Sequence, residues 1–233
     1  MGLLDGKAVV ITGAGRGLGR AYALHAASHG AAVVVNDVDG DEAEKVTAAI
    51  RESGRTAVAN GGSVADPDAA RELVHQCVSE FGSLDGLVNN AGISHHAMPW
   101  AEDTDRIRAV IETNVLGGMC CGTAAARAMH GQGGGVIVNV ASGAILGQTG
   151  AAAYSASKGA IASMTFSWAT DLAEHGIRRL IRFVGDKLLQ VRQMAVKEPV
   201  LQRDHWEVED IACAFDEELR AAVDPPGRDR WWV

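Results

Sequence analysis

The sequence lacks several features that define specialised classes of protein. No apolar run approaches the length of a membrane span, and residues 1–6 have neither the basic nor the apolar region of a secretory signal. Basic residues number 21 against 29 acidic ones, and the formal net charge of −8 disfavours binding to nucleic acid or anionic membranes. The cysteines show neither C-x-x-C nor zinc-binding spacing, and they are Cys77, Cys120, Cys121 and Cys213. These absences predict a cytoplasmic protein without a metal site.

Composition places the chain among ordinary globular proteins. Of its 233 residues, 47% are hydrophobic and 21% are charged, which excludes wholesale disorder and allows a sizeable core without disulfides or metals. Glycine and charge are distributed unevenly, because 26 of the 28 glycines lie in residues 1–177 whereas 21 of the last 56 residues are charged. The chain therefore divides into two compositional regimes with a boundary near residue 178.

Short apolar runs alternate with longer helical segments through the first 177 residues. Strands are predicted at 7–12, 32–36, 56–60, 84–89 and 136–141, and helices at 17–29, 41–53, 67–81, 103–130 and 151–174. Continuous apolar strands are covered on both faces, and their alternation with helices produces right-handed βαβ units. The sequence therefore predicts an α/β fold, a single doubly wound parallel sheet of Rossmann type with helices on both faces. We expect it to occupy one domain over residues 1–233.

A glycine-rich turn follows the first predicted strand, in the run Thr12-Gly13-Ala14-Gly15-Arg16-Gly17-Leu18-Gly19. Small residues let the backbone approach a pyrophosphate, and the following helix offers free N–H groups and a partial positive charge. Asp37 ends the second strand 20 residues after Gly17, where a carboxylate can accept both hydroxyls of an adenosine ribose. A tight turn beside a surface aspartate is the plainer alternative. The strand–turn–helix context favours dinucleotide binding over it.

Four further motifs follow in the order and at the intervals of one enzyme family. The glycine spacing is G-x-x-x-G-x-G, and after it come Asn89-Asn90-Ala91-Gly92, Asn114, Ser142 and Tyr154-Ser155-Ala156-Ser157-Lys158. With these motifs in register, residues 3–177 resemble a short-chain dehydrogenase/reductase. The resemblance implies the fold described above, a nicotinamide cofactor and the interconversion of alcohols and carbonyl compounds.

The residue types at these positions suit that chemistry. Tyr154 and Lys158 lie four apart in a predicted helix, which places them on one face, and an ammonium group beside a phenol favours the tyrosinate that accepts a proton. Ser142 follows the fifth predicted strand and is expected to hydrogen-bond the substrate oxygen. The resemblance further implies that the lysine contacts the nicotinamide ribose and that Asn114 steadies a water in a proton relay. The predicted catalytic residues are therefore Asn114, Ser142, Tyr154 and Lys158.

The cofactor is predicted to be NAD, with NADP as the weaker alternative. The carboxylate of Asp37 would repel a phosphate on the adenosine ribose, and Val38 supplies no compensating charge. Arg16 opposes this interpretation because a basic side chain there can meet such a phosphate, although it also suits an exposed turn. Ser63 stands where the resemblance leads us to expect aspartate near the adenine. The predicted cofactor-binding residues are Gly13, Arg16, Gly17, Leu18, Gly19, Asp37, Ser63, Val64, Asn90, Ala91, Gly92, Tyr154 and Lys158.

The last part of the sequence departs from the family pattern. Strand character continues after residue 177, but the Pro-Gly turn and the threonine that contact the carboxamide in relatives are absent. Residues 206–223 are predicted to be helical. Two interpretations stay open: a diverged lid over a working site, or a rearranged C-terminus that leaves a dinucleotide-binding protein with impaired catalysis.

The expected partner is a small-molecule alcohol or ketone. Binding to nucleic acid or to a membrane is not expected. Steroids, sugars, acyl chains and small ketones are all compatible with residues 1–177. The resemblance also implies a homo-oligomer, either a dimer or a tetramer. His95 and His96 follow the Asn89–Gly92 motif, and they either line the substrate entrance or belong to a solvated loop, the plainer interpretation.

Overall fold

The computed structural model describes residues 2–178, 182–184 and 187–189. Within these residues, parallel strands form a six-stranded sheet in the order β3-β2-β1-β4-β5-β6. The strands are β1 (Ala8–Ile11), β2 (Ala32–Asn36), β3 (Ala57–Asn60), β4 (Gly86–Asn89), β5 (Gly135–Asn139) and β6 (Ile177–Arg178). The predicted doubly wound parallel sheet is confirmed. Its strand order reverses between β1 and β4, and in such sheets ligands bind at the carboxyl ends of the strands beside that reversal.

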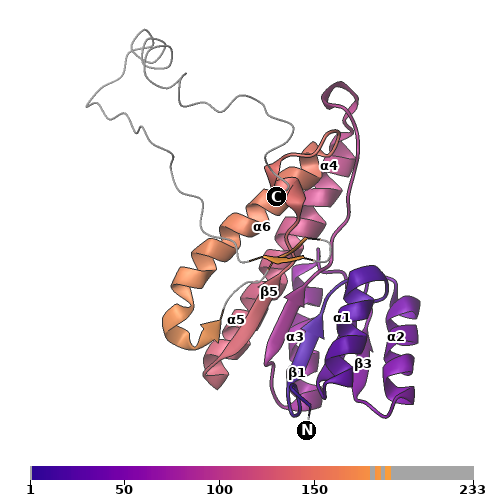
Figure 1. Ribbon diagram of the computed structural model, residues 1–233, viewed down its shortest axis with the longest axis vertical. Coiled ribbons are helices and arrows are strands. Elements are labelled where there is room, and N and C mark those ends of the chain that lie inside the picture. The colour runs from indigo at the N-terminus through magenta and orange to yellow at the C-terminus, as the bar shows by residue number, and fades with distance from the viewer. Residues whose placement is uncertain (1, 179–181, 185–186, 190–233) are drawn as a thin grey trace. The chain divides into compact units, whose positions relative to one another are not determined.

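Helices cover both faces of this sheet (Figure 1). Alternate residues of β1 point to opposite faces. Val9 and Ile11 pack with α1 (Gly17–Ser28) and α2 (Gly40–Glu52), whereas Val10 packs with α3 (Pro67–Phe81) and α5 (Gly118–Gln132). The remaining long helix, α6 (Ala152–Asp171), packs against β5. Burial on both faces explains why the strands are continuous apolar runs. No helix in the described part of the chain is both long and apolar enough to cross a bilayer.

The segment predicted to be helical over residues 103–130 is helical from Thr104 onward, but it is not all α-helix. It consists of α4 (Thr104–Ile111), the π-helical segment η2 (Glu112–Gly117) and α5. Two tertiary contacts accompany the wider turn: the buried Asn114 side chain bonds residues outside the helix, and a Cβ on Gly117 would lie only 2.8 Å from Cγ2 of Val64. Such π-helical turns are rare and occur mostly at functional sites. Helical periodicity alone does not reveal this insertion.

Strand structure continues after α6, as expected, but in two separate pieces. β6 is short and pairs with β5, whereas β7 (Arg182–Val184) and β8 (Lys187–Leu189) pair with each other in an antiparallel arrangement. Strand character was predicted at Leu180, Ile181, Phe183 and Val184; the first two lie outside the described residues. The helix predicted at 206–223 also lies outside them.

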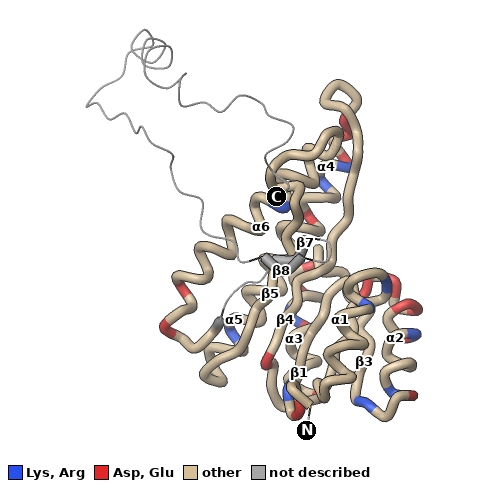
Figure 2. Tube along the Cα trace, in the orientation of Figure 1, with Lys and Arg blue, Asp and Glu red and all other residues tan. Residues whose placement is uncertain are grey.

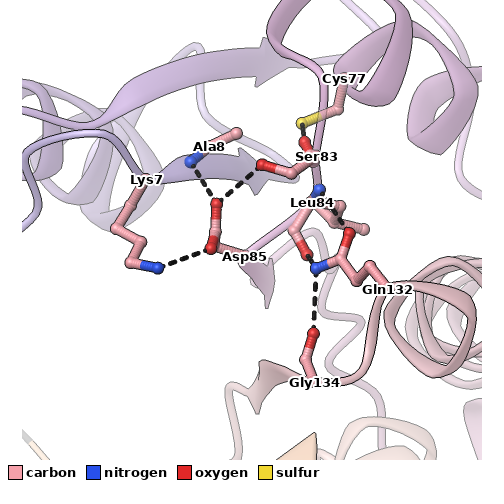
Figure 3. A network of polar contacts seen from close by, with 8 residues as sticks. All are labelled: Lys7, Ala8, Cys77, Ser83, Leu84, Asp85, Gln132 and Gly134. Carbon is pink, nitrogen blue, oxygen red and sulfur yellow. Dashed lines mark hydrogen bonds and ion pairs between the residues drawn. The ribbon is translucent and has the colours of Figure 1, made fainter.

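A polar network holds the amino ends of β1 and β4 together (Figure 3). The Asp85 carboxylate accepts hydrogen bonds from the Ala8 N–H, the Ser83 hydroxyl and the Lys7 ammonium group at 2.8–3.0 Å. Partial burial alone would raise the pKa of Asp85, but these donors hold that pKa below its ordinary value. In the same network Cys77 donates to the Ser83 carbonyl, and burial raises the pKa of its thiol to about 12. Cys77 is therefore an unreactive structural cysteine.

Candidate active site

The glycine-rich turn between β1 and α1 is packed so closely that side chains are excluded at two positions. Gly13 has a φ of +60°, and a Cβ there would lie 2.8 Å from the Cα of Ala91. A Cβ on Gly19 would collide with the carbonyl oxygen of Gly13. The turn is therefore a cradle of bare backbone at the start of α1, which suits the close approach of a pyrophosphate. Leu18 lies at the same helix end with 62% of its surface exposed.

Thr12 and Asn90 tie this turn to the end of β4. The Asn90 amide nitrogen donates to the carbonyl oxygens of Thr12 and Gly13 at 2.9 and 3.1 Å. The Thr12 hydroxyl accepts from the backbone N–H groups of Asn90 and Ala91, both at 3.0 Å. The structure thus brings together two motifs that lie almost eighty residues apart. Our sequence interpretation gave Thr12 no role, although a hydroxyl at the last position before the turn is a usable signal.

Asp37 and Arg16 occupy the outer rim of the turn. Asp37 accepts hydrogen bonds from the N–H of Gly15 at 2.9 Å and from that of Asp39 at 3.0 Å. Arg16 is 67% exposed, and its guanidinium group lies 2.5 Å from Asp39 and 3.6 Å from Glu42. Figure 2 shows acidic and basic residues gathered at this end of α1 and α2. The positive charge of Arg16 is therefore already matched by carboxylates.

Asn114 lies at the centre of the second half of the site. From the π-helical segment η2, its amide nitrogen donates to the Ile93 carbonyl and the Ser157 hydroxyl, both at 2.9 Å, and its oxygen accepts from the Ile93 N–H at 2.8 Å. A Cβ on Gly92 would lie 3.2 Å from that oxygen and 3.7 Å from Nζ of Lys158. Residues from three predicted motifs therefore meet at one place: Asn89–Gly92, Asn114 and Tyr154–Lys158.

Lys158 and Tyr154 lie on one face of α6, as their spacing predicted. Lys158 Nζ is 5.6 Å from the centroid of the Tyr154 ring and donates to the Val140 carbonyl at 2.8 Å. Only 5% of Lys158 is exposed, and this burial lowers its pKa from 10.5 to about 8. The ammonium form still dominates at neutral pH. Tyr154 is half-buried, so its ring is partly accessible to a ligand.

The other predicted residues lie in short turns around this centre. Ser142 caps the 3₁₀ helix η3 (Gly143–Leu146), where its hydroxyl oxygen accepts from the Ala144 N–H at 3.2 Å, and η3 packs against α6. Ser63 accepts from the Ala65 N–H at 3.3 Å. Val64 is buried, and its side chain lies against Gly117 of the π-helical segment.

A buried ladder of side chains, which our sequence interpretation missed, connects the strands to α6. Asn89 donates to the Asn139 side-chain oxygen at 2.9 Å and to the Gly118 carbonyl at 3.1 Å. Asn139 in turn donates to the Thr165 hydroxyl on α6 at 2.9 Å. An asparagine inside an apolar strand is a recognisable signal, because a buried amide needs partners.

A small cavity of about 10 Å³ lies between these groups, roughly the space that one water molecule needs. Its lining includes Thr12, Asn89, Ala91, Asn114, Val140 and Lys158. The cavity joins the Thr12–Asn90 region to the Asn114–Lys158 region.

Comparison with known proteins fits this geometry. Residues 7–182 match the family model described as short chain dehydrogenase. The chain belongs to the short-chain dehydrogenase/reductase family. It is therefore an oxidoreductase with an NAD(P) cofactor and alcohol or ketone substrates.

Individual relatives show how far the similarity extends. The chain is 39% identical over 181 residues to L-rhamnose 1-dehydrogenase (NAD(P)(+)) from Sphingomonas sp. (strain SKA58), covering 76% of this chain and 71% of that protein. The match to cis-4-hydroxycyclohexanecarboxylate dehydrogenase from Sinomonas cyclohexanicum covers 55% of the length of that protein.

Two solved structures show the same fold. A short chain dehydrogenase from Mycobacterium avium has a TM-score of 0.89 at 30% identity, covering 97% of this chain and 98% of its own. A 7α-hydroxysteroid dehydrogenase in complex with NADH and 7-oxo glycochenodeoxycholic acid has a TM-score of 0.72 at 34% identity, covering 76% of this chain and 69% of its own.

Proposed function

We propose that the protein is an NAD(H)-dependent oxidoreductase that interconverts a secondary alcohol and a ketone, with Tyr154 as general acid/base. The observation that carries the proposal is the convergence of Tyr154, Lys158 and Asn114 beside Gly92, next to a turn of bare backbone. Family membership supplies the reaction class, and these contacts support the choice of residues.

The residues of the glycine-rich turn fit a dinucleotide. A Cβ at Gly13 or Gly19 would strike the chain's own backbone, at Ala91 and Gly13 respectively, so only glycine lets the turn close this tightly at the start of α1. Gly13–Gly19 would hold the pyrophosphate, Asp37 the adenosine ribose and Lys158 the nicotinamide ribose. The nicotinamide ring, when bound, accepts or supplies the hydride.

The chain's own side chains move the proton. In the oxidative direction Tyr154 accepts the proton of the substrate hydroxyl, and in the reductive direction it returns a proton to the ketone oxygen. The Lys158 ammonium group places a positive charge 5.6 Å from the centroid of the Tyr154 ring. Ser142 donates a hydrogen bond to the substrate oxygen and orients it. Asn114, fixed by Ile93 and Ser157, steadies the relay that returns the proton to solvent.

The charges on the rim support NAD over NADP. Asp37 follows β2 beside the glycine-rich turn, where its carboxylate accepts from the Gly15 N–H, and Arg16, the one basic group predicted to oppose NAD, is engaged by Asp39 and Glu42. A phosphate on the ribose would have to displace these carboxylates and face Asp37.

The experiment uses both tyrosines of the chain. NADH oxidation is measured with cyclohexanone, acetophenone and ethyl acetoacetate for wild type, Tyr154→Phe and Tyr22→Phe. Loss of the proton donor at Tyr154 should lower kcat by roughly 10²–10⁴-fold without changing NADH affinity, and Tyr22→Phe should retain wild-type turnover. Equal activity of Tyr154→Phe and wild type would refute the assignment. Tight NADH binding without turnover of any ketone would indicate the impaired dinucleotide-binding protein instead.

A further inference from the structure

The connection between β4 and α4 contains a partly buried ionisable pair that the proposed mechanism does not use. Nε2 of His95 lies 3.3 Å from Oε2 of Glu102, and the two side chains are only 22% and 15% exposed. Both atoms are inaccessible to solvent, and neither forms a hydrogen bond in the described part of the chain, so the two groups meet at ion-pair distance and not as an aligned hydrogen bond. Placing two ionisable groups out of water is unfavourable unless they face each other. Their contact is therefore a specific feature of this loop.

Backbone contacts place the pair beside the active site. Ile93, two residues before His95, is held at both its N–H and its carbonyl by Asn114. Ala97, two residues after His95, donates to the Gly150 carbonyl at 2.8 Å, in the turn that leads into the helix of Tyr154. His95 thus lies on a segment that contacts Asn114 at one end and the turn before the helix of Tyr154 at the other.

Glu102 stands at the other end of the same loop. It directly precedes Asp103, which caps α4 by accepting from the N–H groups of Asp105 and Arg106, and α4 leads back to Asn114. The contact between His95 and Glu102 therefore closes the loop across its base. Figure 1 shows this connection extending past the strands beside α4. Its outer part carries Met98 and Trp100, which are 42% and 82% exposed.

We propose that His95 and Glu102 form a positioning pair that fixes the 93–102 loop as a wall of the substrate site. The pair sets substrate affinity and takes no part in proton transfer. This inference rests on the proposed function, since it assigns a role within the same site. Removing either partner leaves the other buried and unpaired, and the loop loses the contact across its base.

The test combines steady-state kinetics with amide hydrogen exchange. The variants are His95→Ala, Glu102→Ala, the double variant, and His96→Ala as the matched control, because His96 is the exposed neighbour. With NADH and whichever of cyclohexanone, acetophenone or ethyl acetoacetate the wild type reduces, each single variant should raise KM about tenfold or more and leave kcat within about twofold. Exchange should accelerate in peptides covering 93–102, and NADH affinity should not change.

The double variant separates a pair from two independent residues. If the two residues act as one unit, the KM of the double variant should be no higher than that of the more impaired single variant. If they act independently, the factors by which the single variants raise KM should multiply. If Glu102→Ala does not fold, Glu102→Gln decides, because it keeps the volume and removes the charge.

Three results would overturn the proposal: unchanged exchange in 93–102, faster exchange without any change in KM, or a His96→Ala effect as large as that of His95→Ala. A wild type that reduces no ketone contradicts the proposed function and, with it, the role in substrate affinity. Exchange still decides in that case whether the pair fixes the loop.

Discussion

Burial of Lys158 makes a quantitative prediction about the stability of the unliganded protein. Its pKa is about 8 in the folded chain and 10.5 as an ordinary lysine. Below pH 8 both states carry the proton, and the folded state bears the whole cost of a buried charge, about 3 kcal/mol at about 1.36 kcal/mol per pH unit. Between pH 8 and 10.5 the unfolded state binds a proton that the folded state has released. Stability therefore rises with pH in this window.

The assay is urea unfolding of wild type and Lys158→Met at pH 7 and pH 9.5, followed by the fluorescence of the chain's five tryptophans. The free energy of unfolding of wild type relative to Lys158→Met should increase by about 2 kcal/mol between the two pH values. Other ionisations occur in both proteins and cancel, as does most of the effect of losing the bond to Val140. A difference that stays constant within about 0.5 kcal/mol would refute the burial argument.

Two further substitutions test the packing of the glycine-rich turn and the Asp85 network at the amino ends of β1 and β4. Gly19→Ala should abolish NADH binding, measured by calorimetry, because its Cβ collides with the Gly13 carbonyl, whereas Gly131→Ala in open space on α5 should bind normally and gain up to about 1 kcal/mol in stability. NADH binding by Gly19→Ala would contradict the cradle. Asp85→Asn should lower the free energy of unfolding at pH 7 by about 1–2 kcal/mol. Because the pKa of Asp85 is lowered in the folded state, its stabilisation is present above its ordinary pKa of 3.8 and is lost as pH falls through the folded value. Urea unfolding at pH 7 and pH 3 measures this, and a deficit that is the same at both would contradict it.

Elements with strong local signals could be predicted from the sequence. The strands are apolar runs buried on both faces, and their order along the chain led directly to the doubly wound sheet. The glycine positions were equally informative, since Gly13 and Gly19 are required by close backbone contacts.

Features that depend on tertiary contacts could not be predicted in this way. The π-helical turn around Asn114 is accompanied by hydrogen bonds to Ile93 and Ser157, which are distant in sequence. The partners of Arg16 likewise lie at the start of the next helix, α2, so its sequence position alone left two interpretations open. The contact between His95 and Glu102 depends on how a loop closes, and no periodicity describes a loop.

The most direct test of the account is a calorimetric titration of the full chain with NADH and, separately, with NADPH. We predict saturable binding of NADH with an affinity at least about tenfold higher than that for NADPH, a difference of about 1.4 kcal/mol. Tighter binding of NADPH would contradict the role given to Asp37 and show that Arg16 outweighs it. Binding of neither would contradict the central claim that this site holds a nicotinamide dinucleotide.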